Sequence, residues 1–361
     1  MRDTAILWIV ALETLFAGAL YLFLPRIARH GLLFGVYVGE QAAAGAPASR
    51  IRRIWARCVI AGTLATAMVQ VALRNSTAAI VCLVAFVLLL LGLYLWAYFA
   101  ARALAPPAPP APAVAIVEED ASAGTLPYVT LVFALACGLL GFAYAAASYA
   151  ELPPRIPTHF GFSGAPDAWR DKSARSVLLL PAIGVIQGFA LGLLCVLVSH
   201  AKRAVRLGDD GTSLRAQLVF RRAVTRFLCG VTWVISLMLA LITVFSIRTA
   251  QGLSEGLPRA VLVLAGVLVV GGVAGVVVLA VRYGQGGARL EGATAAPLTN
   301  GLADNRYWVL GMFYVNRNDP SIMVERRFGL GYTINLGNWK AVVGLIAFLV
   351  LLLGIPLLAA R

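Results

Sequence analysis

Residues 77–100 read TAAIVCLVAFVLLLLGLYLWAYFA, a run of 24 residues without a charged side chain. An α-helix rises about 1.5 Å per residue, so about 20 apolar residues cross the roughly 30 Å hydrocarbon core of a bilayer. We therefore predict a transmembrane helix here. Seven further segments reach or approach this length, at residues 4–24, 58–76, 126–148, 177–199, 228–247, 259–282 and 341–360. The sequence predicts an all-α, polytopic transmembrane helix bundle with about eight spans.

The composition of the 361-residue chain excludes an ordinary soluble protein and indicates the lipid bilayer as its first partner. Hydrophobic residues make up 60% of the chain and charged residues only 13%, against about a half and about a quarter in soluble domains. In a membrane protein, an excess of basic residues is typical of the loops that face the cytoplasm. We therefore interpret the net charge of +14 as a signal of membrane orientation and not of binding to nucleic acid. The five cysteines lie in or beside apolar segments, so we interpret them as packing residues and predict no disulfide or metal site. We also predict no cofactor, because the Gly-x-Gly at 329–331 does not follow a strand and open a helix as a dinucleotide-binding motif does.

The distribution of basic residues predicts which loops face the cytoplasm. Segments 25–57, 101–125, 200–227 and 282–340 together hold 21 of the 30 Lys and Arg residues. Because cytoplasmic loops collect basic residues, we predict that these four segments face the cytoplasm. Both termini and residues 149–176 are then predicted to lie outside.

A Pro/Ala-rich stretch divides the predicted spans into two groups. Residues 105–125 contain five prolines followed by acidic residues, which is typical of a semi-rigid, solvated linker. This linker separates a three-span N-terminal part (1–104) from a four-span core (126–282). A cytoplasmic loop (283–340) then leads to the last span (341–361).

Glycines at helical spacing predict close packing between spans. Gly184, Gly188 and Gly192 fall on one face of the fifth span, and Gly271 and Gly275 on one face of the seventh. Small residues on one face let helix backbones approach closely in lipid, so we interpret these faces as packing surfaces.

The outer loop at 149–181 has an unusual composition. Residues 152–172 read LPPRIPTHFGFSGAPDAWRDK, in which four prolines exclude a regular helix and two glycines allow tight bends. We predict a short, stiff loop at the membrane surface that brings His159 and Asp167 near one another. The candidate binding residues in this loop are Pro157, His159, Phe160, Gly164, Asp167, Trp169 and Lys172.

This loop resembles the short domain of unknown function that heads the SdpI-like bacterial membrane proteins. The resemblance rests on the pattern Leu-Pro-x-x-Ile-Pro-x-His-Phe-x-x-x-Gly-x-Pro-Asp-x-Trp-x-x-Lys, and it departs at Gly161, where Asn is expected. A second element of that family, Phe-Gly-Val/Ile-Arg followed by Trp, is only partly matched by residues 34–36, Tyr37 and Trp55. The resemblance implies a multi-pass protein of the bacterial cytoplasmic membrane with an immunity-type or signalling function.

The last loop carries a second pattern at 304–336. It reads Asp-Asn-Arg-Tyr-Trp-x-x-Gly-x-Phe-Tyr-x-Asn-x-x-Asp-Pro from 304 to 320, and Val-x-Arg-Arg-x-Gly-x-Gly-x-Thr-x-Asn from 324 to 335. This pattern looks like another uncharacterised segment that accompanies the first in many bacterial membrane proteins. We predict a small β-like hairpin at the cytoplasmic face, with strands at 307–315 and 322–327 joined by the turn-forming residues 316–320, and a third extended stretch at 332–336. The candidate residues of this inner segment are Tyr307, Trp308, Tyr314, Asn316, Asp319, Arg327, Gly329, Gly331 and Asn335.

Three functional hypotheses follow from these patterns. The leading one is a non-enzymatic protein that recognises an extracellular peptide or small ligand at the outer loop and signals to a cytoplasmic protein partner. The second is a small-solute or ion transporter that uses Glu13, an acid near the middle of the first span. Glu13 could instead be a structural residue, hydrogen-bonded to a polar neighbour such as Gln70. The third is a membrane enzyme centred on His159, whose alternative interpretation is a side chain that holds the loop in shape.

Overall fold

The computed structural model describes residues 2–28, 31–107, 124–161, 163–201, 212–290 and 304–360. Side chains are described for the same residues except 2–6, 212–214 and 351–360. Some residues of the sequence analysis lie outside this part of the chain. They are most of the predicted linker at 105–125 and parts of the basic segments 25–57, 200–227 and 282–340.

Eight long helices form the bundle in the described part of the chain, and each overlaps one predicted span. They are α1 (Arg2–Ile27), α3 (Ala46–Leu73), α4 (Ser76–Arg102), α5 (Leu126–Ser148), α6 (Ala174–Ser199), α7 (Thr212–Ala250), α8 (Arg259–Val278) and α9 (Trp339–Ala360). Seven of them, α1 and α3 to α8, are long and apolar enough to cross a membrane. α9 has 22 residues, and its described side chains form a shorter apolar stretch at 339–350. The chain is thus a multi-pass membrane protein with an all-α bundle, as the sequence predicts.

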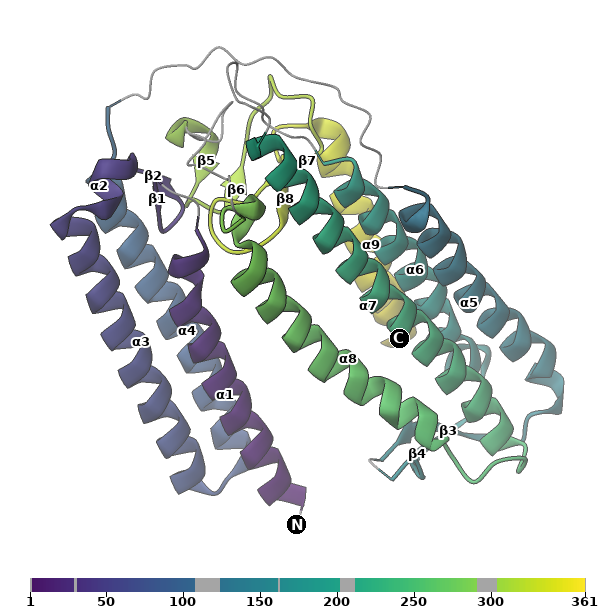
Figure 1. Ribbon diagram of the computed structural model, residues 1–361. Coiled ribbons are helices and arrows are strands. Elements are labelled where there is room, and N and C mark those ends of the chain that lie inside the picture. The colour runs from purple at the N-terminus through teal and green to yellow at the C-terminus, as the bar shows by residue number, and fades with distance from the viewer. Residues whose placement is uncertain are drawn as a thin grey trace.

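The helices alternate in direction, so the connections gather at two ends of the bundle (Figure 1). One end carries the antiparallel hairpin of β3 (Arg155–Phe160) and β4 (Pro166–Asp171), and we call it the β3–β4 end. The other end carries the remaining short elements: α2 (Glu40–Ala44), β1 (Leu32–Leu33), β2 (Val36–Tyr37), β5 (Trp308–Val309), β6 (Phe313–Tyr314), β7 (Met323–Glu325) and β8 (Tyr332–Ile334). We call this the β5–β8 end, and residues 304–336 the β5–β8 segment. The two patterned segments therefore lie at opposite ends of one bundle.

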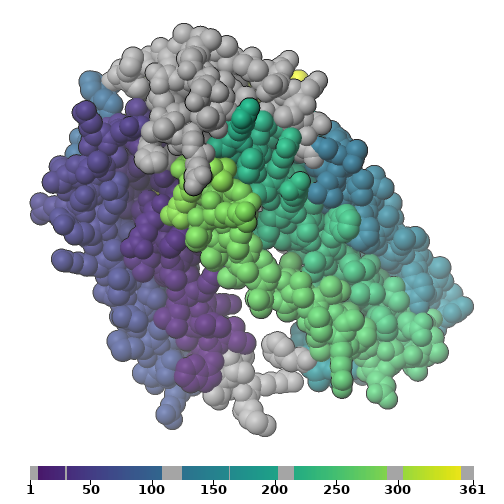
Figure 2. Space-filling view, viewed as in Figure 1, coloured from purple at the N-terminus to yellow at the C-terminus, as the bar shows by residue number. Residues whose placement is uncertain are grey.

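The long helices pack in two groups. α1, α3 and α4 pack against one another, while α5, α6 and α7 form a second group to which α8 and α9 attach. α8 lies against α7, and few of its residues are buried. In the space-filling view, α1 and α8 diverge with distance from the β5–β8 end (Figure 2).

Two helices begin earlier than the sequence predicts. α3 begins at Ala46, whereas the predicted span begins at 58, and α7 begins at Thr212, whereas the predicted span begins at 228. The prediction followed uninterrupted apolar runs, and both additional stretches contain arginines. A helix needs no apolar side chains once it has left the hydrocarbon core, so basic residues of the predicted loop at 200–227, such as Arg215 and Arg226, lie on a helix.

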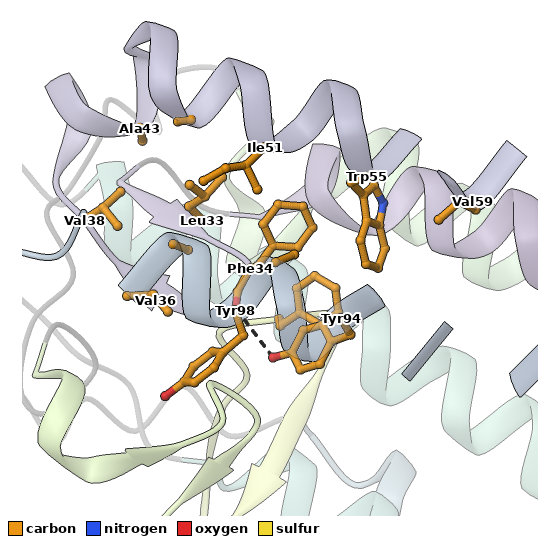
Figure 3. Packing of buried hydrophobic residues seen from close by; sticks show 14 of the residues in the cluster. Leu33, Phe34, Val36, Val38, Ala43, Ile51, Trp55, Val59, Tyr94 and Tyr98 are labelled. Carbon is orange, nitrogen blue, oxygen red and sulfur yellow. Dashed lines mark hydrogen bonds between the residues drawn. The ribbon is translucent and has the colours of Figure 1, made fainter. Parts of the chain in front are cut away.

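A buried aromatic cluster holds the first helix group together. Phe34, between β1 and β2, has a φ of +45°, and its ring lies 5.0 Å from that of Trp55 on α3. The Tyr94 hydroxyl oxygen on α4 lies 3.5 Å from the Phe34 carbonyl oxygen (Figure 3). The partly matched Phe-Gly-Val motif and the later Trp55 therefore meet in this core.

The predicted glycine face of α6 packs directly on α5. A Cβ atom at Gly188 would lie 2.5 Å from the Ala134 carbonyl oxygen, and one at Gly192 would lie 2.7 Å from Leu131 Cα. Both distances are shorter than real Cβ contacts, so only glycine allows this backbone approach. The prediction of close packing on this face is confirmed.

On the second predicted glycine face, only one of the two glycines packs closely against another helix. A Cβ atom at Gly275 would meet the ring of Phe227 on α7. A Cβ atom at Gly271 would meet, among the described residues, only Val267 of its own helix.

The strand pairing at the β5–β8 end differs from the prediction. β5 pairs with β6, and β7 pairs with β8, so there are two small hairpins joined by a single bridge between Tyr314 and Asn335. The predicted strand at 307–315 folds back on itself because Leu310 and Gly311 adopt φ of +52° and +66°, the left-handed backbone of a turn. Residues 316–320 connect the two hairpins and are not the turn of one hairpin.

Candidate functional site

The β3–β4 hairpin is more regular than the stiff loop predicted from its prolines. Arg155 pairs with Asp171, Ile156 with Arg170 and Pro157 with Trp169, and the register shifts on either side of His159. A two-stranded ribbon has an open edge along each strand, so a proline without an N–H group is tolerated there. The prolines exclude a helix, as predicted, but they allow this hairpin.

The hairpin tip rests on the connection between α7 and α8. The Leu257 N–H group donates a hydrogen bond of 2.9 Å to the Gly164 carbonyl. Gly164 has a φ of +84°, and a Cβ atom there would lie 2.7 Å from the Leu257 carbonyl oxygen. Both the backbone angle and the close approach therefore require glycine at this position.

The base of the hairpin is fastened to α5 and α6. The Lys172 ammonium group donates a hydrogen bond of 2.8 Å to the Leu152 carbonyl and lies 5.0 Å from the centre of the Tyr149 ring. Ser173 and Ser176 form a reciprocal capping box that begins α6 directly after β4. Lys172 thus fixes the hairpin at the end of the bundle.

His159 and Asp167 lie together across the hairpin. His159 Nδ1 is 2.5 Å from Asp167 Oδ1, and both side chains are solvent-accessible. Asp167 lies where the register shifts, so the hydrogen bond closes the irregular part of the ribbon. A second pair, Arg155 with Asp171 at 3.9 Å, is largely exposed and contributes little to stability.

A cavity of about 1030 Å³ lies beneath the hairpin, between β3, β4, α6 and α7. Its charged and polar lining near the hairpin includes Arg155, His159, Trp169, Arg170, Asp171 and Arg175. Its apolar lining includes Leu179, Leu180 and Ile183 on α6, Ile242 and Ile247 on α7, and Leu257 in the α7–α8 connection. The cavity is large enough for a small organic ligand.

The candidate residues of the outer loop divide into two sets around this cavity. Pro157, His159, Phe160 and Trp169 line it. The other three, Gly164, Asp167 and Lys172, hold the hairpin in shape through the contacts described above.

Sequence reasoning missed the α7 side of this site. Ser246 donates a hydrogen bond of 3.1 Å to the Pro157 carbonyl, and Thr243 and Ile242 line the cavity beside it. These residues belong to an ordinary apolar span, so only the packing of α7 against β3 identifies them. Arg175 could have been found from the sequence, because it follows the patterned loop at the start of α6.

Glu13 is exposed on α1 and lies far along the chain from every residue of the cavity. Its neighbour Thr14 is fully buried and makes a hydrogen bond of 3.0 Å with Gln70 on α3. Gln70 also donates to the Ala79 carbonyl. The amide named as a partner for Glu13 is therefore used by Thr14 and by α4.

At the other end of the bundle, four of the predicted inner residues form one polar network. The Asn335 amide group donates to the carbonyls of Asn316 and Asp319, each at 2.9 Å. Tyr314 donates to Asp319 Oδ2 at 3.1 Å and accepts from Asn316 Nδ2 at 3.0 Å. Burial raises the pKa of the Tyr314 hydroxyl, which keeps it neutral. The network fixes the connection between the two hairpins.

Arg327 is a buried cation of this segment, with only 1% of its surface exposed. Its guanidinium lies 5.0 Å from the centre of the Trp308 ring and donates a hydrogen bond of 2.6 Å to Asn305 Oδ1. Burial lowers the pKa of Arg327 to about 9, and the charge of Asp304 opposes this shift. Tyr307 lies at the edge of the same cluster, with its ring 6.3 Å from that of Tyr314.

The β5–β8 segment contacts both helix groups. On the first group, Asn305 Nδ2 donates to the Tyr37 carbonyl at 3.0 Å, and the Tyr94 hydroxyl on α4 donates to the Leu310 carbonyl at 2.7 Å. On the second, Gln285, which follows α8, donates to the Gly331 carbonyl at 3.0 Å. Gly329 and Gly331 have φ of +90° and +92° and form the turn that presents this carbonyl. The segment therefore bridges the two groups.

Two family models match parts of the chain. A domain of unknown function (DUF1648) matches residues 137–185, and a family of unknown function (DUF5808) matches residues 317–342. No curated protein and no solved structure matches the chain. The first match contains the β3–β4 hairpin and the start of α6, and the second contains β7 and β8. The prediction of one short domain of unknown function and a separate C-terminal segment is confirmed.

The described residues hold no group of three or more His, Cys, Asp or Glu side chains that could bind a metal ion. The cavity lining contains one histidine and one carboxylate, His159 and Asp171. What the arrangement offers chemically is a hollow with cationic side chains at its hairpin end and apolar side chains along its helices.

Proposed function

We propose that this protein is a non-enzymatic receptor of the bacterial cytoplasmic membrane, which binds a ligand in the cavity beneath β3–β4 and changes state at its β5–β8 end. In this proposal the β3–β4 end faces outward and the β5–β8 segment contacts a cytoplasmic partner. The sequence resemblance to SdpI-like proteins adds an immunity-type or signalling role.

The observation that carries the proposal is the position of the cavity. It lies between the hairpin and the beginning of α6, within the stretch matched by the first family model, and it is completed by α7. Loops held on a rigid scaffold are common binding sites. The patterned residues of this stretch therefore serve to build a ligand site, with Trp169 and His159 in its wall.

α7 supplies the route between the two ends. Near its C-terminal end, Ser246 bonds to the Pro157 carbonyl of β3. Near its N-terminal end, the Phe220 ring lies 6.4 Å from that of Tyr332 on β8. A movement of the hairpin that displaces α7 would therefore also displace the β5–β8 segment. This segment contacts the first helix group through Asn305 and Leu310.

The two other hypotheses have less support from these contacts. Glu13 lies on an exposed face of α1 and is not part of the cavity, so transport through this site would not use it. His159 is hydrogen-bonded to Asp167, an arrangement that explains its place in the hairpin without a reaction.

Hydrogen exchange on the full-length protein tests the proposal. The protein is placed in phosphatidylcholine nanodiscs and measured before and after addition of an organic-solvent extract of bacterial envelopes. We expect slower exchange at residues 155–171 together with altered exchange at 305–336. The variant Leu180→Trp, which narrows the apolar part of the cavity, should lose both changes. Phe189→Trp is the matched control, because Phe189 is exposed on the same helix and lies outside the cavity.

Two results would overturn the proposal. One is an unchanged exchange pattern in the wild-type protein at both ends. The other is a response of Leu180→Trp equal to that of the wild type, because the larger side chain occupies the apolar wall that the ligand would contact.

A further inference from the structure

We propose that the ligand of this cavity is an anionic phospholipid, drawn from the bilayer leaflet at the β3–β4 end, with its phosphate at the arginines and an acyl chain along α6 and α7. The inference rests on the proposed function, because it names the ligand class of the same site. Three observations carry it: the charge of the cavity rim, the depth of the cavity, and the hydrogen bonds by which the hydroxyl groups of its α7 wall are already bound to carbonyl groups of the protein.

The rim of the cavity is cationic. Arg155, Arg170 and Arg175 line it, against the single acid Asp171 among the lining residues. The three arginines are exposed, and the contact between Arg155 and Asp171 is long, at 3.9 Å. A guanidinium offers paired N–H donors that match the oxygens of a phosphate. The rim therefore selects a negatively charged headgroup.

The cavity is about as deep as one leaflet of hydrocarbon. On α6 its lining extends from the first turn to Ile183, nine residues after Ala174, which is about 14 Å along the helix. On α7 it extends from Ala250 back to Ile242, eight residues or about 12 Å. Half of a bilayer core measures roughly 15 Å. The arginines then lie at headgroup depth and the apolar wall lies at the depth of the acyl chains.

The hydroxyl groups of the α7 wall are already satisfied by the protein. Thr243 donates to the Leu239 carbonyl at 2.9 Å, and Ser246 donates to the Pro157 carbonyl at 3.1 Å. The neighbouring lining residues at this depth, Leu180, Ile183 and Ile242, are apolar. Each of these two hydroxyl groups has already donated its hydrogen to a carbonyl and offers a polar ligand no donor, whereas an acyl chain needs none. Trp169 at the rim suits the interface between headgroups and chains.

The headgroup part of the proposal is tested by native mass spectrometry. The full-length protein in mild detergent is mixed with equal amounts of phosphatidylglycerol and phosphatidylcholine of the same chain length. We expect at least tenfold greater retention of phosphatidylglycerol, lost in the variant Arg155→Gln/Arg170→Gln/Arg175→Gln. The control Arg248→Gln/Arg259→Gln removes two arginines at the same end of the bundle that do not line the cavity, and it should retain the lipid. Equal retention of both lipids, or equal loss in the two variants, would overturn the proposal.

The acyl-chain part of the proposal is tested by two further variants and by a competition experiment. Leu180→Trp should lower phosphatidylglycerol retention about tenfold, while Phe189→Trp should leave it unchanged. Glycerol 3-phosphate, which carries the same phosphate without a chain, should not displace the lipid at millimolar concentration. Displacement by it would show a site for soluble phosphates and would overturn the lipid assignment.

The outcome can be separated from that of the proposed function. If phosphatidylglycerol is not preferred but the envelope extract still alters exchange at both ends, only the lipid assignment fails. If phosphatidylglycerol binds as described but residues 305–336 do not respond, the lipid site stands and the receptor function fails.

Discussion

Gly164 is the residue on which the position of the β3–β4 hairpin depends most directly. Its backbone has a positive φ, and its Cα faces the Leu257 carbonyl at a distance that leaves no space for a side chain. The nearby Gly252 also has a positive φ, of +74°, but a Cβ atom there would meet nothing within 4 Å. The two glycines therefore separate the cost of the backbone angle from the cost of the contact.

We predict that Gly164→Ala destabilises the protein more than Gly252→Ala. Gly252→Ala should cost about 1–2 kcal/mol, because an L-residue must take the left-handed region. Gly164→Ala should add roughly 1–3 kcal/mol for overpacking against Leu257. Thermal unfolding in detergent gives the order, and hydrogen exchange at 155–171 should accelerate only in Gly164→Ala. Equal effects of the two substitutions would show that the tip can move away without cost.

At the scale of helices, the features that depend only on the order of residues along the chain are the ones the sequence predicts best. The spans follow from apolar length alone. Asn75, which follows Arg74, accepts a hydrogen bond from the Ala78 N–H group and caps the beginning of α4. The strand pairing of the β5–β8 segment was wrong because the turn is made at Leu310, a residue without turn character. The cavity could not be predicted, since its α7 wall looks like any apolar helix.

The α5–α6 pair gives a prediction at this scale. A Cβ atom at Gly188 would collide with the α5 backbone at Ala134, so Gly188→Ala should push the two helices apart and cost about 1–3 kcal/mol. Gly230 on α7 has open space where its Cβ would be, so Gly230→Ala should be neutral or slightly stabilising. Both are measured as shifts in thermal unfolding temperature. If Gly230→Ala lowered the unfolding temperature as much as Gly188→Ala, the close approach of α6 to α5 would not be the cause of the destabilisation.

At the scale of the whole molecule, the arrangement of charge and of connections can be compared directly. The β5–β8 end gathers the described parts of segments in which the sequence places most Lys and Arg residues, including α2, β1, β2 and 284–290. The β3–β4 end gathers Arg74, the hairpin and the α7–α8 connection. The grouping of loops into two ends thus agrees with the alternation of the predicted spans, while the side of the membrane on which each end lies stays a prediction from charge.

Single-cysteine labelling tests that orientation. In a background with all five cysteines replaced, Ser163→Cys places a probe at the hairpin tip and Arg317→Cys places one on an exposed connection of the β5–β8 segment. Because basic loops remain in the cytoplasm, we expect Ser163→Cys to react with an impermeant maleimide in intact cells and Arg317→Cys to react only after permeabilisation. The reverse pattern would place the cavity in the cytoplasmic leaflet. It would exclude a receptor for extracellular ligands, and the lipid proposed for the cavity would then have to come from the inner leaflet. Reaction of both positions from one side would contradict the placement of the two patterned segments at opposite ends of a membrane-spanning bundle.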